Sequence, residues 1–290
     1  MRRQMRPQGI GPMLREWRKR RNLSQLALAL QTGISSRHLS FVETGRAVPS
    51  RDLVLRLAEQ LDVPMRQRNS LLMAAGYAPA YEETPISEAQ MAQADEAINR
   101  LLAGHDPYPA VVLDSASNLR RANRSAMALL DGVPAELLRP PVNVMRLALH
   151  PEGLAPRILN FAEWRMHLLG RLRREAAFTD DECLLSLYDE VSAYRYPQGM
   201  ADPERSTDPE HADGRQIAIP LRIEALGSEL SFFSALTMFA APVDITLAEL
   251  TIETFYPADT RTATVLHSYY QAVNKDESAP GELVGHWTAP

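Results

Sequence analysis

Two segments in the C-terminal two hundred residues carry side chains that could bind a small acid. Asn143 with Arg146, and His167 with Arg171, are polar groups on otherwise apolar stretches. A guanidinium holds a carboxylate through two parallel hydrogen bonds, and pockets for small molecules are mostly apolar with a few polar anchors. Arg146 or Arg171 is therefore a candidate anchor for a ligand carboxylate. For His167 a core histidine bonded to the backbone is the favoured interpretation, with a ligand contact as the alternative.

Apolar side chains near these groups are further candidates for the wall of such a pocket: Phe161, Trp164, Leu168, Phe233 and Met238. The first three share one face of a helix predicted over about residues 160–176. Phe233 and Met238 lie on opposite faces of a predicted strand, and the sequence leaves open which face points inward. Aromatic residues and methionines at these spacings also form ordinary cores, so a pocket and a packed interior are both open.

The sequence lacks the common motifs of catalysis. It contains no HExxH string, no glycine-rich phosphate-binding loop and no nucleophile elbow. The seven histidines are scattered, and the single cysteine excludes an internal disulfide and any multi-cysteine metal site. We interpret Cys183 as a small packed residue. We therefore expect a protein that is not an enzyme, with no catalytic residues, no metal and no cofactor apart from a bound ligand.

Charge is distributed unevenly along the 290 residues. Residues 1–80 carry a net charge of +9 and the remainder carries −14, which together give the −5 of the whole chain. This asymmetry predicts that only the first part meets a polyanion, although a basic face without a partner has the same signature. No stretch approaches the roughly 18 apolar residues of a membrane-spanning helix, so we expect a cytoplasmic protein with no membrane partner.

Short helices with clear start and stop signals fill the basic part. Ser24 and Ser35 are good N-caps, Gly33 supplies a tight turn between two helices, and Gly45 ends the second of them. Two short helices separated by a glycine turn at this spacing form a helix-turn-helix unit. The five predicted helices cover about residues 14–21, 25–32, 36–44, 52–61 and 65–75.

The string LSQLALALQTGISSRHLSFVETGRAVPS resembles the XRE/Cro-repressor helix-turn-helix family, and the resemblance extends over roughly residues 10–64. It implies an all-α, five-helix, lambda-repressor-like domain that binds double-stranded DNA. Leu26 and Leu30 depart from the family pattern because these positions are usually polar. Their presence implies an extra apolar contact with another domain or subunit.

The resemblance also implies which residues touch DNA: Gln25, Ser35, Ser36, Arg37, Ser40 and Arg46. Gln25 should grip a phosphate together with the N-terminus of its helix. Ser36, Arg37 and Ser40 should face the major groove, where Arg37 can bind a guanine through two hydrogen bonds. Arg46 should contact the DNA backbone. Glu43 is the inward acid of the pattern and should pair with an arginine of the first helix, such as Arg15.

A stretch with two prolines and no periodicity, YAPAYEETP, marks a boundary between domains. We expect a helix-turn-helix domain, a linker with a connecting helix, a second domain and a tail over residues 1–80, 81–104, 105–275 and 276–290. A capping box of Ser87 and Gln90 should open the connecting helix. Its apolar seam runs through Met91, Ala94, Ile98 and Leu101. The seam fits a helix packed on its own domain or a short dimerising helix.

The second domain combines strands and helices. Strands are predicted over about residues 109–114, 119–123, 216–225, 229–241 and 249–258, and helices over about 125–130, 160–176, 180–195 and 260–273. Thr179 and Glu182 form a capping box for the third of these helices. A hairpin, then helices, then a three-stranded meander is the order of an α+β, PAS-like domain, in which helices cover an antiparallel sheet.

A second resemblance lies in the strings PAVVLDSASNLRRANRSAMALL, NVMRLALHPEG, FAEWRMHLLGRLRRE and DDECLLSLYDEV. They resemble the ligand-binding domain of MmyB-type regulators over most of residues 105–260. In that family a PAS-like domain follows a helix-turn-helix of this kind. The resemblance therefore implies a transcription factor that is regulated through its C-terminal domain.

The sequence thus predicts a sequence-specific DNA-binding transcription regulator that binds operator DNA as a homodimer. A small apolar ligand in the C-terminal domain should modulate it, and we expect a long apolar acid such as a fatty acid. The alternatives are a C-terminal domain that only dimerises or binds a protein partner, and an enzyme, for which the sequence offers no motif.

Overall fold

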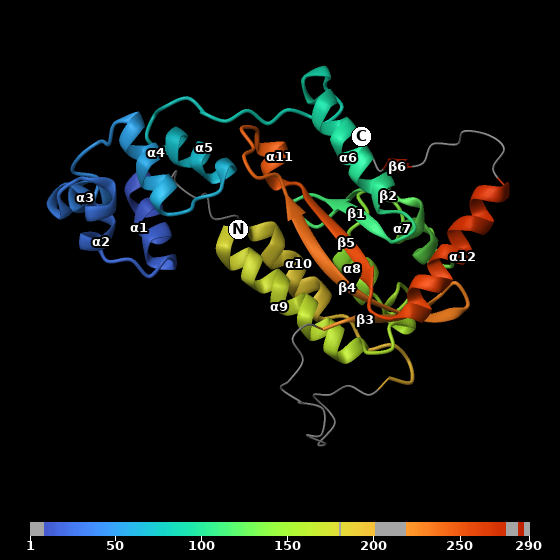
Figure 1. Cartoon of the computed structure of the whole chain (residues 1–290). Helices are drawn as coiled ribbons and strands as arrows, with labels where there is room; N and C mark the ends of the chain where they lie inside the picture. The colour runs from blue at the N-terminus through green and yellow to red at the C-terminus, as the bar shows by residue number, and fades with distance from the viewer. Residues whose placement is uncertain (1–8, 180, 201–218, 277–283, 287–290) are drawn as a thin grey trace. The chain divides into compact units, whose positions relative to one another are not determined.

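The computed structural model describes residues 9–179, 181–200, 219–276 and 284–286. Two compact units make up the chain (Figure 1), one around residues 9–84 and one around residues 85–276. Two short segments, 178–179 and 242–248, group with the first unit. No helix among the described residues is long and apolar enough to cross a bilayer.

Five helices form the first unit, as predicted: α1 (Ile10–Arg20), α2 (Gln25–Thr32), α3 (Ser36–Glu43), α4 (Arg51–Gln60) and α5 (Met65–Ala74). The serine caps explain where three of them begin, because the hydroxyls of Ser24, Ser35 and Ser50 accept hydrogen bonds from the first-turn amides of α2, α3 and α4. Gly33 ends α2 in the left-handed conformation, with φ of 70°. The turn between α2 and α3 is therefore specified locally.

A close contact between α1 and α3 fixes how the helices of the first unit pack. Gly11 of α1 is buried against the backbone at the end of α3. A Cβ atom at this position would lie 2.6 Å from the carbonyl oxygens of Val42 and Glu43. Only glycine permits this approach, which brings the apolar faces of the helices, with Leu14 and Leu39 fully buried, into one core.

Replacing Gly11 with alanine should destabilise the first unit even though alanine favours the helix. The gain in helix propensity is about 1 kcal/mol. The clash with two backbone carbonyls forces the helices apart and should cost about 1–3 kcal/mol or more. Chemical denaturation of the full chain measures the net effect. Gly104→Ala is the matched control, because Gly104 is an exposed helical glycine of the second unit and a Cβ there meets nothing within 4 Å; equal stabilities of the two variants would contradict close packing at Gly11.

The second unit contains an antiparallel sheet with the strand order β3-β4-β5-β1-β2-β6. Its strands are β1 (Ala110–Leu113), β2 (Leu119–Asn123), β3 (Leu221–Ala225), β4 (Ser228–Met238), β5 (Thr251–Pro257) and β6 (Val284–His286). The predicted hairpin and the predicted meander are both confirmed. Part of the strand predicted over 216–225, and all of the tail predicted over 276–290 except residues 276 and 284–286, lie outside the described residues.

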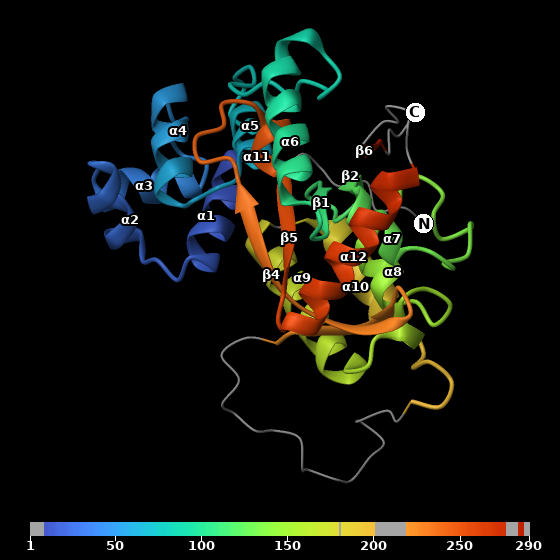
Figure 2. The ribbon, with the colours of Figure 1, turned by 45° about the vertical axis from the view of Figure 1, so that its right-hand side comes forward.

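The helices that follow α5 in the chain are α6 (Ala92–His105), α7 (Arg124–Leu129), α8 (Val144–Leu149), α9 (Phe161–Thr179), α10 (Glu182–Ser192), α11 (Ile245–Glu249) and α12 (Thr260–Asp276), with single 3-10 turns at Ala89–Met91 and Ala155–Arg157. Of these, most of α11 lies in the segment that groups with the first unit. Helices α9 and α10 run side by side (Figures 1 and 2) and pack Leu168, Leu172 and Leu187 into one core with Ile223 and Phe232 of the sheet. An α+β domain with helices over an antiparallel sheet is therefore confirmed.

The structure corrects several local predictions. The short helices α8 and α11 were not predicted. Asp181, not Thr179, caps α10, because its carboxylate accepts the amide hydrogen of Cys183 and Thr179 still belongs to α9. No side-chain cap opens the turn that follows Ser87. Cys183 itself is exposed rather than packed.

The connecting helix α6 packs on its own domain. Ile98 and Leu102 are buried, whereas Leu101 is 51% exposed, so the apolar face of α6 is turned one residue from the predicted seam. The buried Arg121 of β2 ties the helix to the sheet through hydrogen bonds to Asp95 and Asn99. Of the two alternatives for this helix, the packed one agrees with the structure.

Candidate functional sites

The outer face of α3 presents hydrogen-bond donors. Ser36 and Arg37 are exposed and Ser40 is half-buried, whereas Leu39 and Val42 on the opposite side are buried in the core. Ser35 is exposed too, and its hydroxyl oxygen accepts the amide hydrogen of His38. The sequence placed all three outward residues on this face, and the structure brings them together there.

Phe41 links the two arginines of this face. The guanidinium carbon of Arg37 lies 5.4 Å from the centroid of the Phe41 ring, and that of Arg46 lies 6.0 Å from it. The turn after α3 fixes Arg46, because its amide donates a hydrogen bond of 2.7 Å to the Phe41 carbonyl. A cation near an aromatic ring is stabilised by about 0.5–1 kcal/mol at exposed sites. Phe41 therefore positions both guanidinium groups, a role that the sequence analysis missed.

Replacing Phe41 with leucine should weaken DNA binding about fivefold, since each cation–π contact of about 0.5–1 kcal/mol is lost while the apolar bulk is kept. Phe41→Tyr retains the ring and should bind like the unmodified chain. Fluorescence anisotropy titrations of labelled DNA measure both. If leucine and tyrosine variants bind equally well, Phe41 does not position the arginines.

A buried ion pair joins α1 to the C-terminal end of α3. Glu43 pairs with an arginine of α1, as predicted, but the partner is Arg18 and not Arg15; the two hydrogen bonds measure 2.6 and 2.9 Å. Only 1% of the Glu43 side chain is exposed. Burial raises the pKa of Glu43, but the hydrogen bonds from Arg18 and Gln25 outweigh burial and hold that pKa below its ordinary value. Arg15 contributes only a longer-range attraction.

Gln25 lies at the start of α2 as predicted, but its amide nitrogen donates to Glu43 at 2.8 Å. That nitrogen carries a second hydrogen, so the phosphate contact expected of Gln25 and of the N-terminus of α2 stays a prediction. Leu26 and Leu30, the two departures from the family pattern, are 60% and 73% exposed. Their exposure leaves an apolar pair on the surface of the first unit.

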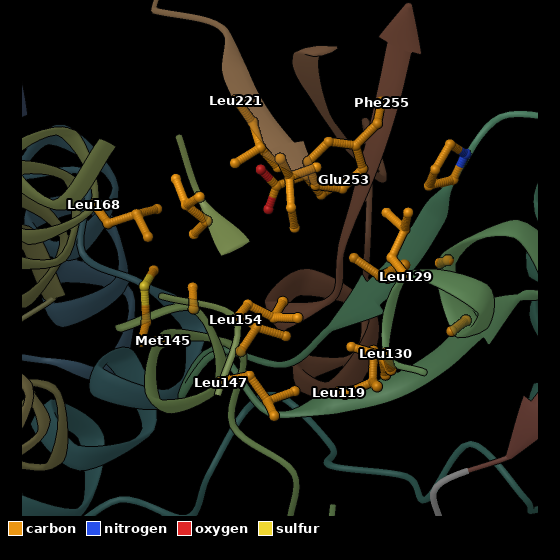
Figure 3. A pocket seen from close by; sticks show the side chains of 18 of the residues that line it. Leu119, Leu129, Leu130, Met145, Leu147, Leu154, Leu168, Leu221, Glu253 and Phe255 are labelled. Carbon is orange, nitrogen blue, oxygen red and sulfur yellow. The ribbon is translucent and has the colours of Figure 1, made fainter. Parts of the chain in front are cut away.

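The second unit contains an apolar cavity of about 120 Å³ between the sheet and the helices α7, α8 and α9 (Figure 3). Its walls include Val111 and Leu119 from the hairpin, Ile223 and Phe255 from the meander, and Trp164 from α9. Four residues of the unpredicted helix α8 also line it: Val144, Met145, Leu147 and Ala148.

One ion pair interrupts the apolar wall. Among the lining residues, only Arg171 of α9 and Glu253 of β5 carry charge. Two nitrogens of the Arg171 guanidinium lie 3.1 and 3.4 Å from the two carboxylate oxygens of Glu253. The Arg171 side chain is 19% exposed and that of Glu253 is 6% exposed. The cavity is thus apolar apart from one ion pair, between Arg171 and Glu253.

Three of the predicted ligand-binding residues line this cavity: Trp164, Leu168 and Arg171. His167 stacks on Trp164 with the ring centroids 5.2 Å apart, but it does not line the cavity. Burial, together with the nearby Arg171 and Arg174, lowers the pKa of His167. Phe161 is a core residue packed on Tyr196.

Two predicted polar anchors lie away from the cavity. Asn143 is buried and caps α8, and its amide nitrogen donates to the carbonyl of Ala116. Arg146 binds Glu190 of α10 through two hydrogen bonds of 2.7 Å. Hydrogen bonds from Arg146 and from Tyr194 hold the pKa of Glu190 at about 2. Both predicted anchors therefore stabilise the fold around α8 rather than the cavity wall.

The register of β4 decides which of its faces points inward. Phe233 pairs with Tyr256 and is 42% exposed on the face away from the cavity. Phe232, on the other face, is fully buried in the core. Met238 shares the inner face but is 68% exposed, beyond the cavity. Neither Phe233 nor Met238 lines the cavity, so the structure places both predicted residues outside it.

Two family comparisons agree with these two sites. Residues 14–67 match the helix-turn-helix family, and residues 94–268, more than half of the chain, match the family described as the MmyB-like transcription regulator ligand binding domain. No curated protein matches the chain. The first match contains the outward face of α3, and the second contains the cavity.

Proposed function

Since the chain belongs to the MmyB-like transcription regulators and is a DNA-binding regulator with a ligand-binding domain, we propose that an apolar acid in the cavity controls its affinity for operator DNA. The observation that carries this proposal is the cavity itself, which is apolar except for Arg171 and Glu253. An enclosed apolar cavity of about 150 Å³ holds a guest of the size of benzene. A cavity of about 120 Å³ that is partly open would therefore take part of a longer apolar chain, and the rest would extend from its mouth.

The chemistry of the walls favours a hydrocarbon tail. Each methylene group removed from water contributes about 0.8 kcal/mol to binding, and leucine, isoleucine, valine and aromatic side chains surround the chamber. A ligand with one polar head would place that head at the Arg171–Glu253 pair and its tail among the apolar residues. A fatty acid has this form.

We further propose that two copies of the chain bind one operator. Two α3 helices in successive major grooves, about 34 Å apart, would read a pseudo-palindromic site. A ligand that fits one dimer geometry better than another would change operator affinity through a coupling of about 1–3 kcal/mol. Binding in the second unit would then regulate a contact made by the first.

The ligand proposal is tested with purified, delipidated full chain and decanoate. We expect decanoate to displace a fluorescent fatty acid from the chain and native mass spectrometry to detect a one-to-one complex. Ala148 lines the cavity, so Ala148→Phe should fill it and abolish displacement. Ala135→Phe, at an exposed position, is the control. A blocked variant that binds decanoate as well as the control, or an unmodified chain that does not bind it, would contradict the proposal.

A further inference from the structure

The strand register turns Glu253 into the cavity. Glu253 pairs with Leu236 of β4, and both side chains lie on the same face of the sheet as Phe255, which lines the cavity. Figure 3 shows the Glu253 carboxylate between Leu221 and Phe255, directed into the chamber. Its carboxylate oxygens meet the guanidinium of Arg171 there. The negative charge of Glu253 thus lies in an otherwise apolar wall. It lies beside Arg171, the one cation in that wall to which an acidic ligand could bind.

Stability does not explain this pair. A buried ion pair is often no more stabilising than well-packed apolar side chains of the same volume, because the desolvation of both charges offsets their attraction. The surrounding wall is apolar, so a leucine at either position would fit the chemistry of the cavity. The pair does provide a planar guanidinium that can hold one carboxylate through two hydrogen bonds. In the structure Glu253 supplies that carboxylate.

We propose that Arg171 is the recognition group for the acidic head of the ligand and that Glu253 is an internal competitor, which holds the guanidinium until the ligand displaces it. This inference rests on the apolar acid proposed above and adds the residue that sets head-group selectivity. Glu253 takes the edge of the guanidinium that is formed by its two terminal nitrogens, so an acid binds that edge only in place of Glu253, and two carboxylates at one guanidinium also repel each other.

The surroundings of Glu253 permit this exchange. Leu236, its cross-strand neighbour on the same face, is 53% exposed, which means that solvent reaches this face one strand away. A displaced carboxylate can turn toward that water. An alcohol carries no charge that competes for Arg171, so its tail enters the cavity while the Arg171–Glu253 contact stays in place. Acid binding, but not alcohol binding, therefore depends on Glu253.

Calorimetric titrations of the full chain with decanoate and with decanol test this dependence. Glu253→Gln keeps the shape of the side chain and removes its charge, so the affinity for decanoate should rise about tenfold or more. The affinity for decanol should change by less than about threefold, because no charge pair is broken. Glu229→Gln is the matched control, since Glu229 pairs with Arg222 on the exposed surface of the same sheet. It should change neither affinity.

Arg171→Gln is a second and independent variant. It should weaken decanoate binding about tenfold or more and leave decanol binding within about threefold, because only the acid uses the guanidinium. Circular dichroism shows whether Glu253→Gln folds. If it does not fold, Arg171→Gln alone tests the recognition of the acid. The competitor role of Glu253 is contradicted if the decanoate affinity is unchanged in Arg171→Gln. It is also contradicted if the affinities for acid and alcohol change equally in either variant. If neither ligand binds any form of the chain, the apolar ligand itself is refuted, together with this inference.

Discussion

Replacing Glu43 with glutamine should unfold the first unit or leave it only marginally stable. Glu43 holds the buried Arg18 guanidinium through two hydrogen bonds, and removing its charge leaves Arg18 without an anionic partner. Breaking a buried pair from one side costs about 3–5 kcal/mol. Whole domains have about 5–15 kcal/mol of stability, so this loss is a large fraction of the total. DNA binding should be lost together with the fold.

Hydrogen exchange followed by mass spectrometry measures this loss locally in the full chain. The amides of α1 to α5 should lose protection in Glu43→Gln, whereas the sheet of the second unit keeps its protection. Glu16→Gln is the matched control because Glu16 forms an exposed pair with Arg20, four residues away in α1. Such pairs contribute about 0.3–0.5 kcal/mol. Equal protection in the two variants would show that the Arg18–Glu43 pair does not stabilise the unit.

The same pair makes the first unit sensitive to acid. The pKa of Glu43 is lower in the folded chain than its ordinary value. The stabilisation is therefore complete above the ordinary carboxyl pKa of about 4.3 and is lost as the pH falls through the lower folded value. Denaturation at a series of pH values should show the unmodified chain and Glu43→Gln converging in acid. A constant difference down to the lowest pH would contradict this assignment.

Replacing Arg37 with alanine should weaken binding to the preferred DNA site by about 1–3 kcal/mol and relax selectivity at one base pair. Arg37 is exposed on the outward face of α3 and its guanidinium lies near the Phe41 ring. Arg46, in the turn after α3, should bind phosphate instead. Arg46→Ala is therefore expected to weaken all sequences alike and to reduce the salt dependence of binding by about one unit of slope.

Anisotropy titrations against a site obtained by in vitro selection, and against its single-base variants, separate these two effects. Arg139→Ala serves as the control because Arg139 is an exposed arginine of the second unit, outside the helix-turn-helix. If Arg37→Ala loses affinity equally for every base variant, Arg37 does not read a base and the assignment of the reading face is wrong.

The first unit was largely predictable because its signals are local. Ser24, Ser35 and Gly33 specify caps and a turn within a few residues of themselves. The choice of Arg18 over Arg15 as the partner of Glu43 was not predictable, since it depends on how α1 crosses α3. That crossing follows from the contact of Gly11 with the carbonyls of Val42 and Glu43, which lie far along the sequence.

The cavity was predictable only in part, for the same reason. The apolar face of α9 was clear from its spacing, and Trp164, Leu168 and Arg171 do line the cavity. The inward face of β4 depends on its register with β5, which no local pattern specifies. Helix α8 is six residues long, too short for a clear period. Glu253 was not among the predicted site residues, because the alternating pattern of its strand does not say which face points inward; its register with β1 and β4 does.

Occupancy of the cavity should change the affinity of the chain for DNA. The most direct test is the dissociation constant of the full chain for the selected DNA site, measured with and without saturating decanoate. We expect a change of about 5–150-fold for the unmodified chain and none for the cavity-filled variant Ala148→Phe. An unmodified chain that binds decanoate yet holds the same DNA equally well with and without it would contradict this expectation.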